Sequence, residues 1–204
     1  MAGQQADGSL LVGVLALQGD FQAHKSVLEA LGATVREVRT PAQLADLDAL
    51  VLPGGESTTM TLGIEREGLA EPLRALRRSG VPILGTCAGL ILADRDHLAL
   101  MDMRAQRNAF GRQVHSFEAD LDLGLDGGPV RAAFIRAPWI TDPGPGVELL
   151  AQVDGHAVAA REGSVTVLSF HPEISGEHRL HARFLEEALQ HRRDRGSAPS
   201  DRFS

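Results

Sequence analysis

Short apolar runs alternate with amphipathic segments along the first half of the chain. Three runs, LLVGVLAL, DALVLPGG and VPILGTC, have almost no polar positions, which is typical of strands buried on both faces of a sheet. They are residues 10–17, 48–55 and 81–87. Residues 21–31 repeat apolar side chains on one helical face after Asp20, a candidate N-cap, and residues 69–78 form a second amphipathic segment. This alternation predicts right-handed crossovers and a mainly parallel sheet.

The second half of the chain has shorter spacings between its apolar segments. Residues 116–123 alternate apolar and polar positions, and the segments that follow are separated by turns rich in glycine and proline. We expect these segments to form antiparallel strands or hairpins at residues 132–140, 147–155 and 156–163. Residues 165–170 predict one more buried strand, and residues 175–191 predict a closing helix. The fold class is therefore α/β with three layers, in which antiparallel strands extend a mostly parallel central sheet.

Length and composition indicate one folded domain. The chain has 204 residues, of which 43% are hydrophobic and 23% charged, so it can bury a core and is not globally disordered. The last residues are rich in charge, glycine, serine and proline, which predicts a flexible tail over residues 192–204. Residues 1–9 predict a second flexible tail, and the domain then covers residues 10–191.

Charge and cysteine content exclude several classes of function. The formal net charge of −7 argues against a surface that binds nucleic acid. The sequence contains no run of about 18 apolar residues, so we expect no membrane span. The polar start of the chain lacks the pattern of a secretion signal. Cys87 is the only cysteine, so no internal disulfide can form, and we expect a reducing, cytoplasmic location.

The sequence Gly85-Thr86-Cys87-Ala88-Gly89 is the strongest chemical signal. It lies between a predicted buried strand and an apolar helix start, where flanking glycines allow a sharp turn that exposes the central residue at the sheet edge. A helix N-terminus favours a thiolate and offers amide groups to an oxyanion. The alternative is a buried structural cysteine, but the flanking glycines favour a nucleophile.

A thiolate nucleophile needs a base, and His171 and Glu173 follow the last predicted strand. Residues two apart in extended chain face the same side, so Glu173 can hold one imidazole nitrogen while the other faces Cys87. A surface ion pair is the alternative for an isolated His-x-Glu. Together with the turn at Cys87, the pattern favours a Cys87–His171–Glu173 triad.

The sequence Pro53-Gly54-Gly55-Glu56-Ser57-Thr58-Thr59 follows another buried strand. Two glycines allow the backbone to approach a ligand closely, and we expect Ser57 or Thr58 to cap the next helix. The Gly-Lys-Ser/Thr ending of a phosphate loop is absent. An ordinary strand-to-helix turn is the alternative interpretation of this segment.

These motifs resemble those of the class I glutamine amidotransferases, and more narrowly of the glutaminase subunits of pyridoxal 5'-phosphate synthases. The matching segments are VGVLALQGDFQAH, LVLPGGESTTM, GTCAGLILA, RNAFGRQVHSFE, FIRAPWI and SFHPEISGEHRLH. They cover nearly the whole chain in the expected order. The resemblance implies a three-layer, flavodoxin-like fold and hydrolysis of L-glutamine to L-glutamate and ammonia. It also implies a synthase partner in a large hetero-oligomer, which receives the ammonia to make pyridoxal 5'-phosphate.

The resemblance also implies a role for individual residues. Cys87 would be the nucleophile, His171 the base and Glu173 the residue that orients it. The implied glutamine-binding residues are Gly55, Glu56, Ser57, Arg107, Ile135 and Arg136. Backbone amides at Gly55 and Ala88 would form the oxyanion hole, and Gln18 and Gly19 a loop that responds to the partner. No cofactor or metal is implied.

Two rival functions stay open on the sequence alone. One is the glutaminase subunit of another amidotransferase, against which the LALQGD, RNAFGRQ and FIRAP segments argue. The other is a non-catalytic regulatory subunit of the same fold, against which the intact cysteine, histidine and glutamate argue. His178 and His181 are three residues apart, but we expect a structural role for them rather than a metal site.

The chain departs from the family in one segment. Family members have a longer stretch between the helix after the cysteine and the RNAFGRQ motif, whereas here Ala93-Asp94-Arg95-Asp96-His97 leads almost directly into Leu98. We expect a trimmed surface loop here, with an effect on the helix end and on any partner contact nearby.

Overall fold

Five parallel strands form the centre of the sheet. The computed structural model describes residues 8–107 and 116–197. The parallel strands are β1 (Leu11–Leu15), β2 (Thr34–Val38), β3 (Ala49–Leu52), β4 (Ile83–Thr86) and β11 (Val165–Leu168). They lie side by side in the order β2-β1-β3-β4-β11. Because this order places β4 beside both β3 and β11, the segments that follow these three strands lie close together at one sheet edge.

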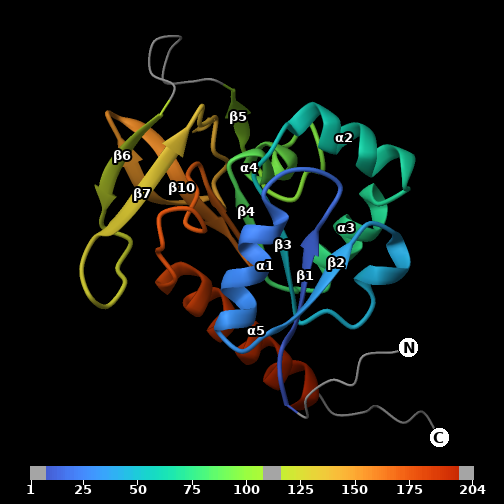
Figure 1. The fold of residues 1–204 in the computed structure, drawn as a ribbon. Coiled ribbons are helices and arrows are strands. Elements are labelled where there is room, and N and C mark those ends of the chain that lie inside the picture. Colours follow the sequence, from blue (N-terminus) through green and yellow to red (C-terminus); the bar gives the residue numbers. More distant parts are fainter. Residues whose placement is uncertain (1–7, 108–115, 198–204) are drawn as a thin grey trace, which may run out of the picture.

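Antiparallel strands extend the sheet beyond β11, as the sequence predicts. They are β10 (His156–Glu162), β8 (Trp139–Thr141), β5 (Arg104–Gln106) and β9 (Glu148–Val153). A separate two-stranded sheet pairs β6 (Ser116–Leu121) with β7 (Val130–Ile135). This pair stands at the antiparallel end of the molecule, away from α2 (Ser57–Arg66) and α3 (Ala70–Arg78) (Figure 1).

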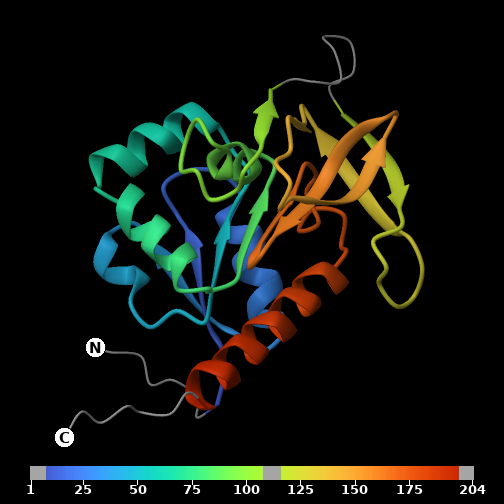
Figure 2. The ribbon, with the colours of Figure 1, turned by 180° about the vertical axis from the view of Figure 1, so that it is seen from behind.

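Helices cover both faces of the parallel sheet and produce three layers. Alternate residues of β1 separate the two cores: Leu11 and Leu15 pack with side chains of α2, α3 and α4 (Ala88–Ala93). Val12 and Val14 face the other way, toward α1 (Phe21–Ala30) and α5 (Arg179–Ser197). Figure 2 shows α5, in red, running diagonally along the molecule.

A short 3-10 helix, η1 (Pro41–Leu44), completes the helical elements of the described residues. None of these helices has the length and apolar composition that a membrane crossing requires.

The C-terminal helix differs from its predicted bounds. The sequence predicts a helix over residues 175–191 and a tail from residue 192, but α5 begins at Arg179 and continues to Ser197. The extension is held in place because Arg192 donates hydrogen bonds to the carbonyl oxygens of Ser9 and Gly8 at 3.0 and 2.9 Å. The rest of the predicted tails, residues 1–7 and 198–204, lies outside the described residues.

The segment predicted as one strand over residues 132–140 is divided into two. Arg136 has a positive φ of 45°, and Pro138 lacks the N–H that a strand ladder needs. As a result β7 ends at Ile135 in the small sheet, and β8 begins at Trp139 in the large one. The break ends the regular pairing of β7 at Ile135, opposite Ser116, and takes Arg136 out of the ladder.

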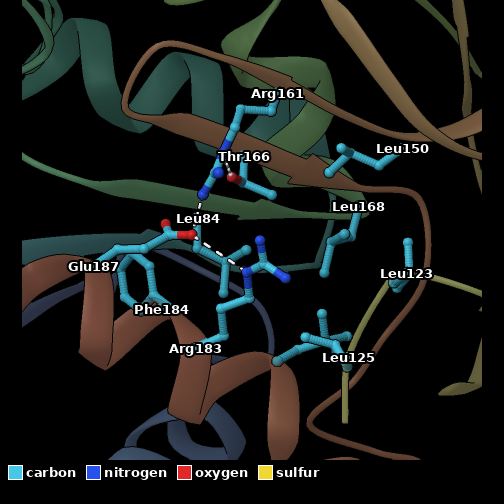
Figure 3. Close-up of a pocket in the computed structure, with 11 residues that line it drawn as sticks. Leu84, Leu123, Leu125, Leu150, Arg161, Thr166, Leu168, Arg183, Phe184 and Glu187 are labelled. Carbon is cyan, nitrogen blue, oxygen red and sulfur yellow. Dashed lines mark hydrogen bonds and ion pairs between the residues drawn. The ribbon is translucent and has the colours of Figure 1, made fainter. Parts of the chain in front are cut away.

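A small apolar cavity of about 60 Å³ lies between α5 and the sheet. Figure 3 shows leucine side chains and Phe184 around it, with Arg161, Arg183 and Glu187 at its polar side. Glu187 pairs with both arginines, and Arg161 also donates to the hydroxyl of Thr166 at 3.3 Å. The ion-pair cluster borders the polar side of the cavity. The cavity lining contains none of the predicted site residues.

Candidate active site

Cys87 lies at the turn between β4 and α4. Its backbone has φ 46° and ψ −102°, a conformation that residues other than glycine rarely adopt, and its amide donates to Leu168 O of β11 at 2.8 Å. The flanking glycines are required by close packing. A Cβ on Gly89 would collide with the carbonyl of Leu52, and one on Gly85 would lie 2.9 Å from Gly89 O. The turn therefore places a free, 8% exposed thiol at the carboxyl edge of the sheet.

His171 and Glu173 follow β11 at the same edge and are hydrogen-bonded to each other. Nδ1 of His171 lies 2.7 Å from Glu173 Oε1, and both residues are buried. Burial alone would lower the pKa of His171, but hydrogen bonds and charge from Cys87 and Glu173 outweigh it and raise the pKa to about 10. The imidazole is therefore held in its protonated form at neutral pH, between the thiol and the carboxylate.

Cys87 and His171 line one open cavity of about 430 Å³. Its lining contains every residue predicted for glutamine and for the oxyanion hole, with three residues that were not predicted for the site, Asp20, Ile91 and Pro138. The predicted residues that line it are Gln18, Gly55, Glu56, Ser57, Cys87, Ala88, Arg107, Ile135, Arg136 and His171. Glu173 lies behind His171 rather than on the cavity wall, which fits an orienting residue.

Glu56, and not Ser57 or Thr58, caps α2. Its carboxylate accepts hydrogen bonds from the amides of Thr58 and Thr59 at 3.0 and 2.6 Å. The hydroxyl of Thr59 also donates to it at 2.7 Å, and this bond together with the two amide bonds lowers the pKa of Glu56 to about 2. Hydroxyl side chains are commoner helix caps, but the longer carboxylate reaches two amides at once. Glu56 is thus a fixed negative charge at the cavity edge.

Arg107 and Arg136 reach the cavity from different segments. Arg136 follows β7 at the break described above, and the carbonyl of the preceding residue, Ile135, lies 4.0 Å from the sulfur of Cys87. Arg107 donates to Thr58 Oγ1 at 3.2 Å and lies 3.3 Å from Nε2 of His97. With the protonated His171, these two arginines are the cations among the described lining residues that a carboxylate ligand could meet in this cavity.

The segment after α4, predicted as a trimmed loop, is folded around one buried carboxylate. Asp94 accepts hydrogen bonds from the amides of Asp96 and Ala105, and its Oδ1 lies 2.7 Å from His97 Nδ1. Because His97 in turn contacts Arg107, this segment supports a residue of the cavity. Residues 108–115, which include most of the RNAFGRQ motif, lie outside the described residues.

The loop at Gln18 and Gly19 rests on the glycine turn after β3. Gln18 Oε1 accepts a hydrogen bond from the amide of Glu56 at 2.6 Å, and the amide of Asp20 donates to Gly54 O at 3.1 Å. Gly19 has a φ of 96°, and a Cβ there would collide with Gly54 O. The loop therefore fixes the direction of the Gly54–Gly55 peptide, although Gly19 itself does not line the cavity.

Two features of the site are missing from the sequence-based prediction. The sequence predicts Asp20 only as a helix cap, yet its carboxylate lies 3.9 Å from Nδ1 of His171. His24 occupies the apolar face of α1 and is fully buried behind Glu173. A histidine at helical spacing among apolar residues is the available signal for it.

His178 and His181 lie in different surroundings, so they do not form the pair that a metal site would need. His178 is exposed, whereas His181 is buried and lies 2.9 Å from His24. In the described residues, the group of three side chains spaced to hold a metal ion is Asp20, His171 and Glu173, two of which already pair with each other.

A cysteine at a strand-to-helix turn, with a His–Glu pair from the neighbouring parallel strand, defines the class of glutamine amidotransferases built on this fold. The model of the SNO glutamine amidotransferase family matches residues 14–190, and the chain belongs to this family.

Curated relatives and solved structures agree with this membership. A Streptomyces avermitilis protein named pyridoxal 5'-phosphate synthase subunit PdxT is 49% identical over 186 residues, covering 86% of this chain and 92% of the relative. A protein of the same name from Pelotomaculum thermopropionicum is 51% identical over 187 residues, with 88% and 95% covered.

Among solved structures, a glutamine amidotransferase has a TM-score of 0.80 and 43% identity, covering 87% of this chain and 98% of that one. The structure of PurLQS from Thermotoga maritima contains a chain with a TM-score of 0.64 at 18% identity, covering 89% of this chain and 98% of that one. The second similarity shows the shared fold alone.

Proposed function

We propose that this chain hydrolyses L-glutamine to L-glutamate and ammonia, with Cys87 as nucleophile, His171 as acid and base, and Glu173 as the residue that orients His171. The observation that carries the proposal is that Cys87 and His171 line one cavity while Glu173 holds the far nitrogen of the imidazole. Membership of the SNO glutamine amidotransferase family supports the same reaction.

The raised pKa of His171 accounts for the first half of the reaction. A protonated imidazole beside Cys87 favours the thiolate, which attacks the side-chain carbonyl carbon of glutamine. We assign the oxyanion to the backbone amides of Gly55 and Ala88. His171 then gives its proton to the departing nitrogen, so that ammonia leaves and a thioester remains on Cys87.

Formation of the thioester changes the protonation state of His171 for the second half of the reaction. Hydrogen bonding and charge from Cys87 help to keep His171 protonated, and acylation removes that negative charge. The neutral imidazole now acts as base and takes a proton from water, whose oxygen attacks the thioester. Glutamate leaves, the proton on His171 is retained and the thiolate is restored.

We assign glutamine recognition to Gly55, Glu56, Ser57, Arg107, Ile135 and Arg136. The α-carboxylate of glutamine needs a cation, and Arg136 lines the cavity next to Ile135. The α-amino group needs an anion, and Glu56 is an exposed carboxylate that stays ionised down to low pH.

Arg136→Ala is expected to weaken glutamine use strongly. Loss of one charge-assisted contact costs about 1.5–3 kcal/mol, which corresponds to roughly a ten- to hundredfold fall in kcat/KM. Steady-state glutamate formation in the presence of the synthase measures this change in kcat/KM. Arg131→Ala is the matched control, because Arg131 lies on β7, which ends just before Arg136, but pairs with Glu118 and Asp120 on the surface. Equal kcat/KM for the two variants would remove Arg136 from the binding site.

We propose that the ammonia passes to the synthase subunit of a pyridoxal 5'-phosphate synthase, within a large hetero-oligomer in the cytoplasm. The name of the curated relatives supports this acceptor over that of another amidotransferase. The single free thiol at Cys87 must stay reduced to react, which supports a reducing compartment.

We further propose that the partner switches on the site through the loop at Gln18 and Gly19. The Asp20 amide holds Gly54 O, and in a trans peptide the following N–H points in the opposite direction. Movement of this loop therefore reorients the Gly55 amide that we assign to the oxyanion. Uncoupled hydrolysis would waste glutamine, which gives such gating a purpose.

Glutamate production by the chain alone, and then with saturating synthase, tests both proposals. We expect low activity alone and a large stimulation by the partner. Gln18→Leu, which removes the acceptor of the Glu56 amide, should reduce the stimulated rate far more than the basal rate, whereas Gln190→Leu on the exposed face of α5 should change neither. Equal rates with and without synthase would contradict gating, and no glutamate in either sample would contradict glutamine hydrolysis.

A further inference from the structure

A buried cluster of polar side chains lies directly behind the triad, and the reaction described above does not use it. His24 from α1, His181 from α5 and Thr86 from β4 are all fully buried. His24 Nδ1 lies 2.9 Å from His181 Nε2, and His24 Nε2 lies 3.0 Å from Thr86 Oγ1. Side chains of two helices on one face of the sheet thus reach Thr86, the last residue of β4 before Cys87.

The same imidazole reaches the second carboxylate oxygen of Glu173. Oε1 is hydrogen-bonded to His171, whereas Oε2 is buried and lies 3.3 Å from His24 Nε2. In the described part of the chain Oε2 accepts no regular hydrogen bond, and Nε2 of His24, at 3.3 Å, is the nitrogen placed to donate to it after a small movement. A buried carboxylate without a donor on one oxygen is costly, so the proton on His24 has a defined place.

The protonation states of the two histidines follow from their surroundings. Burial, then the charges of His181 and His171, lower the pKa of His24 well below its usual value. Burial and the neighbouring His178 lower the pKa of His181 to about 4. Both imidazoles are therefore neutral at neutral pH, and each carries a single N–H.

One pair of tautomers turns an N–H of His24 toward the carboxylate. If His181 Nε2 carries its proton and donates to His24 Nδ1, the proton of His24 must lie on Nε2, which faces Glu173 Oε2 and Thr86 Oγ1. The opposite pair would turn the lone pair of His24 Nε2 toward the carboxylate. The tautomer of His24 is thus coupled to that of His181.

We propose that His24 is a positioning residue for the triad, and that His181 keeps it in the tautomer that donates to Glu173. By holding Oε2, His24 fixes the plane of the carboxylate so that Oε1 stays on His171. A carboxylate that accepts at both oxygens cannot rotate away from the imidazole. The activity readout of this inference rests on the proposed glutamine hydrolysis, but the second readout below does not.

The kinetic test compares two substitutions at His24. His24→Leu removes the donor, and we expect kcat with saturating synthase to fall roughly ten- to a hundredfold while KM changes less than about twofold. His24→Gln keeps a donor near the Nε2 position and should recover most of this loss. His178→Gln, at an exposed histidine near the start of α5, should behave as wild type. Equal kcat for the leucine variant and wild type would overturn the proposal, as would equal losses for leucine and glutamine.

A second test does not depend on glutamine turnover. NMR titration of the His171 ring in the free chain should give a lower pKa in His24→Leu than in wild type, because a loosened Glu173 stabilises the imidazolium less well. His181→Leu, which frees the tautomer of His24, should shift it in the same direction and serves if His24→Leu does not fold. An unchanged His171 titration in the folded variant would overturn the proposal. If wild type shows no glutaminase activity but the shift is present, the proposed function fails and this inference stands.

Discussion

Cys87→Ala is expected to reduce glutamine hydrolysis at least about a thousandfold, measured as glutamate formation with saturating synthase. Cys87 is the only cysteine of the chain, and its turn presents the sulfur to the cavity that His171 also lines. Among the described residues that line the cavity, no other side chain is a comparable nucleophile beside a protonated imidazole. The loss should therefore appear in kcat, with glutamine binding retained.

The same substitution should leave the fold almost unchanged. The lost sulfur is small and lies at the cavity edge, so we expect the melting temperature to change by only a few degrees. His171 should also titrate at a lower pH in this variant, because Cys87 contributes to its raised pKa. Near-normal glutamate formation by a folded Cys87→Ala chain would show that the triad is assigned wrongly.

Gly54→Ala is expected to cause the second-largest loss of activity, about a hundredfold or more. A Cβ on Gly54 would collide with Cε1 of His171 and lie 3.0 Å from its Nδ1. The same Cβ would be 3.5 Å from Cys87 Cβ, so Gly54 occupies the space where the two catalytic side chains approach each other. The imidazole must move to make room, and a displacement of about 1 Å has large effects on catalysis.

Stability should fall much less than activity in Gly54→Ala. The backbone of Gly54 does not have a positive φ, so the alanine is not strained by its own conformation, and overpacking costs about 1–3 kcal/mol. Gly146→Ala is the control, because its Cβ would meet ordinary contacts with Glu162 far from the triad. Thermal unfolding and glutamate formation measured on both variants separate the two effects. Full activity in Gly54→Ala would mean that the His171 ring is not held where the structure places it.

The buried parallel strands were predictable because their signal is local. Runs such as residues 48–55 and 81–87 contain the observed β3 and β4, and glycines on both sides of Cys87 indicate a sharp turn whatever the rest of the fold. The edge strand β2 has no such signal. It contains Arg36 and Glu37 and is only partly buried along most of its length, so its pairing with β1 depends on the rest of the sheet.

Features that depend on distant partners were beyond the sequence. The end of α5 is stabilised by the contact of Arg192 with Gly8 and Ser9, more than 180 positions away in the chain. The cap of α2 is a local feature, but Glu56 was missed for this role because hydroxyl side chains such as that of Ser57 are the commoner caps. His24 is likewise an ordinary helical residue until α5 places His181 against it.

The identity of the reacting atom is tested most directly by mass spectrometry of the chain treated with a glutamine-analogue alkylating agent in the presence of synthase. We predict a single added label, located on Cys87, with glutamate formation lost in proportion to labelling and glutamine protecting against both. Labelling at another residue, or full glutamine hydrolysis by the chain labelled at Cys87, would contradict the central claim that a thioester at Cys87 carries the reaction.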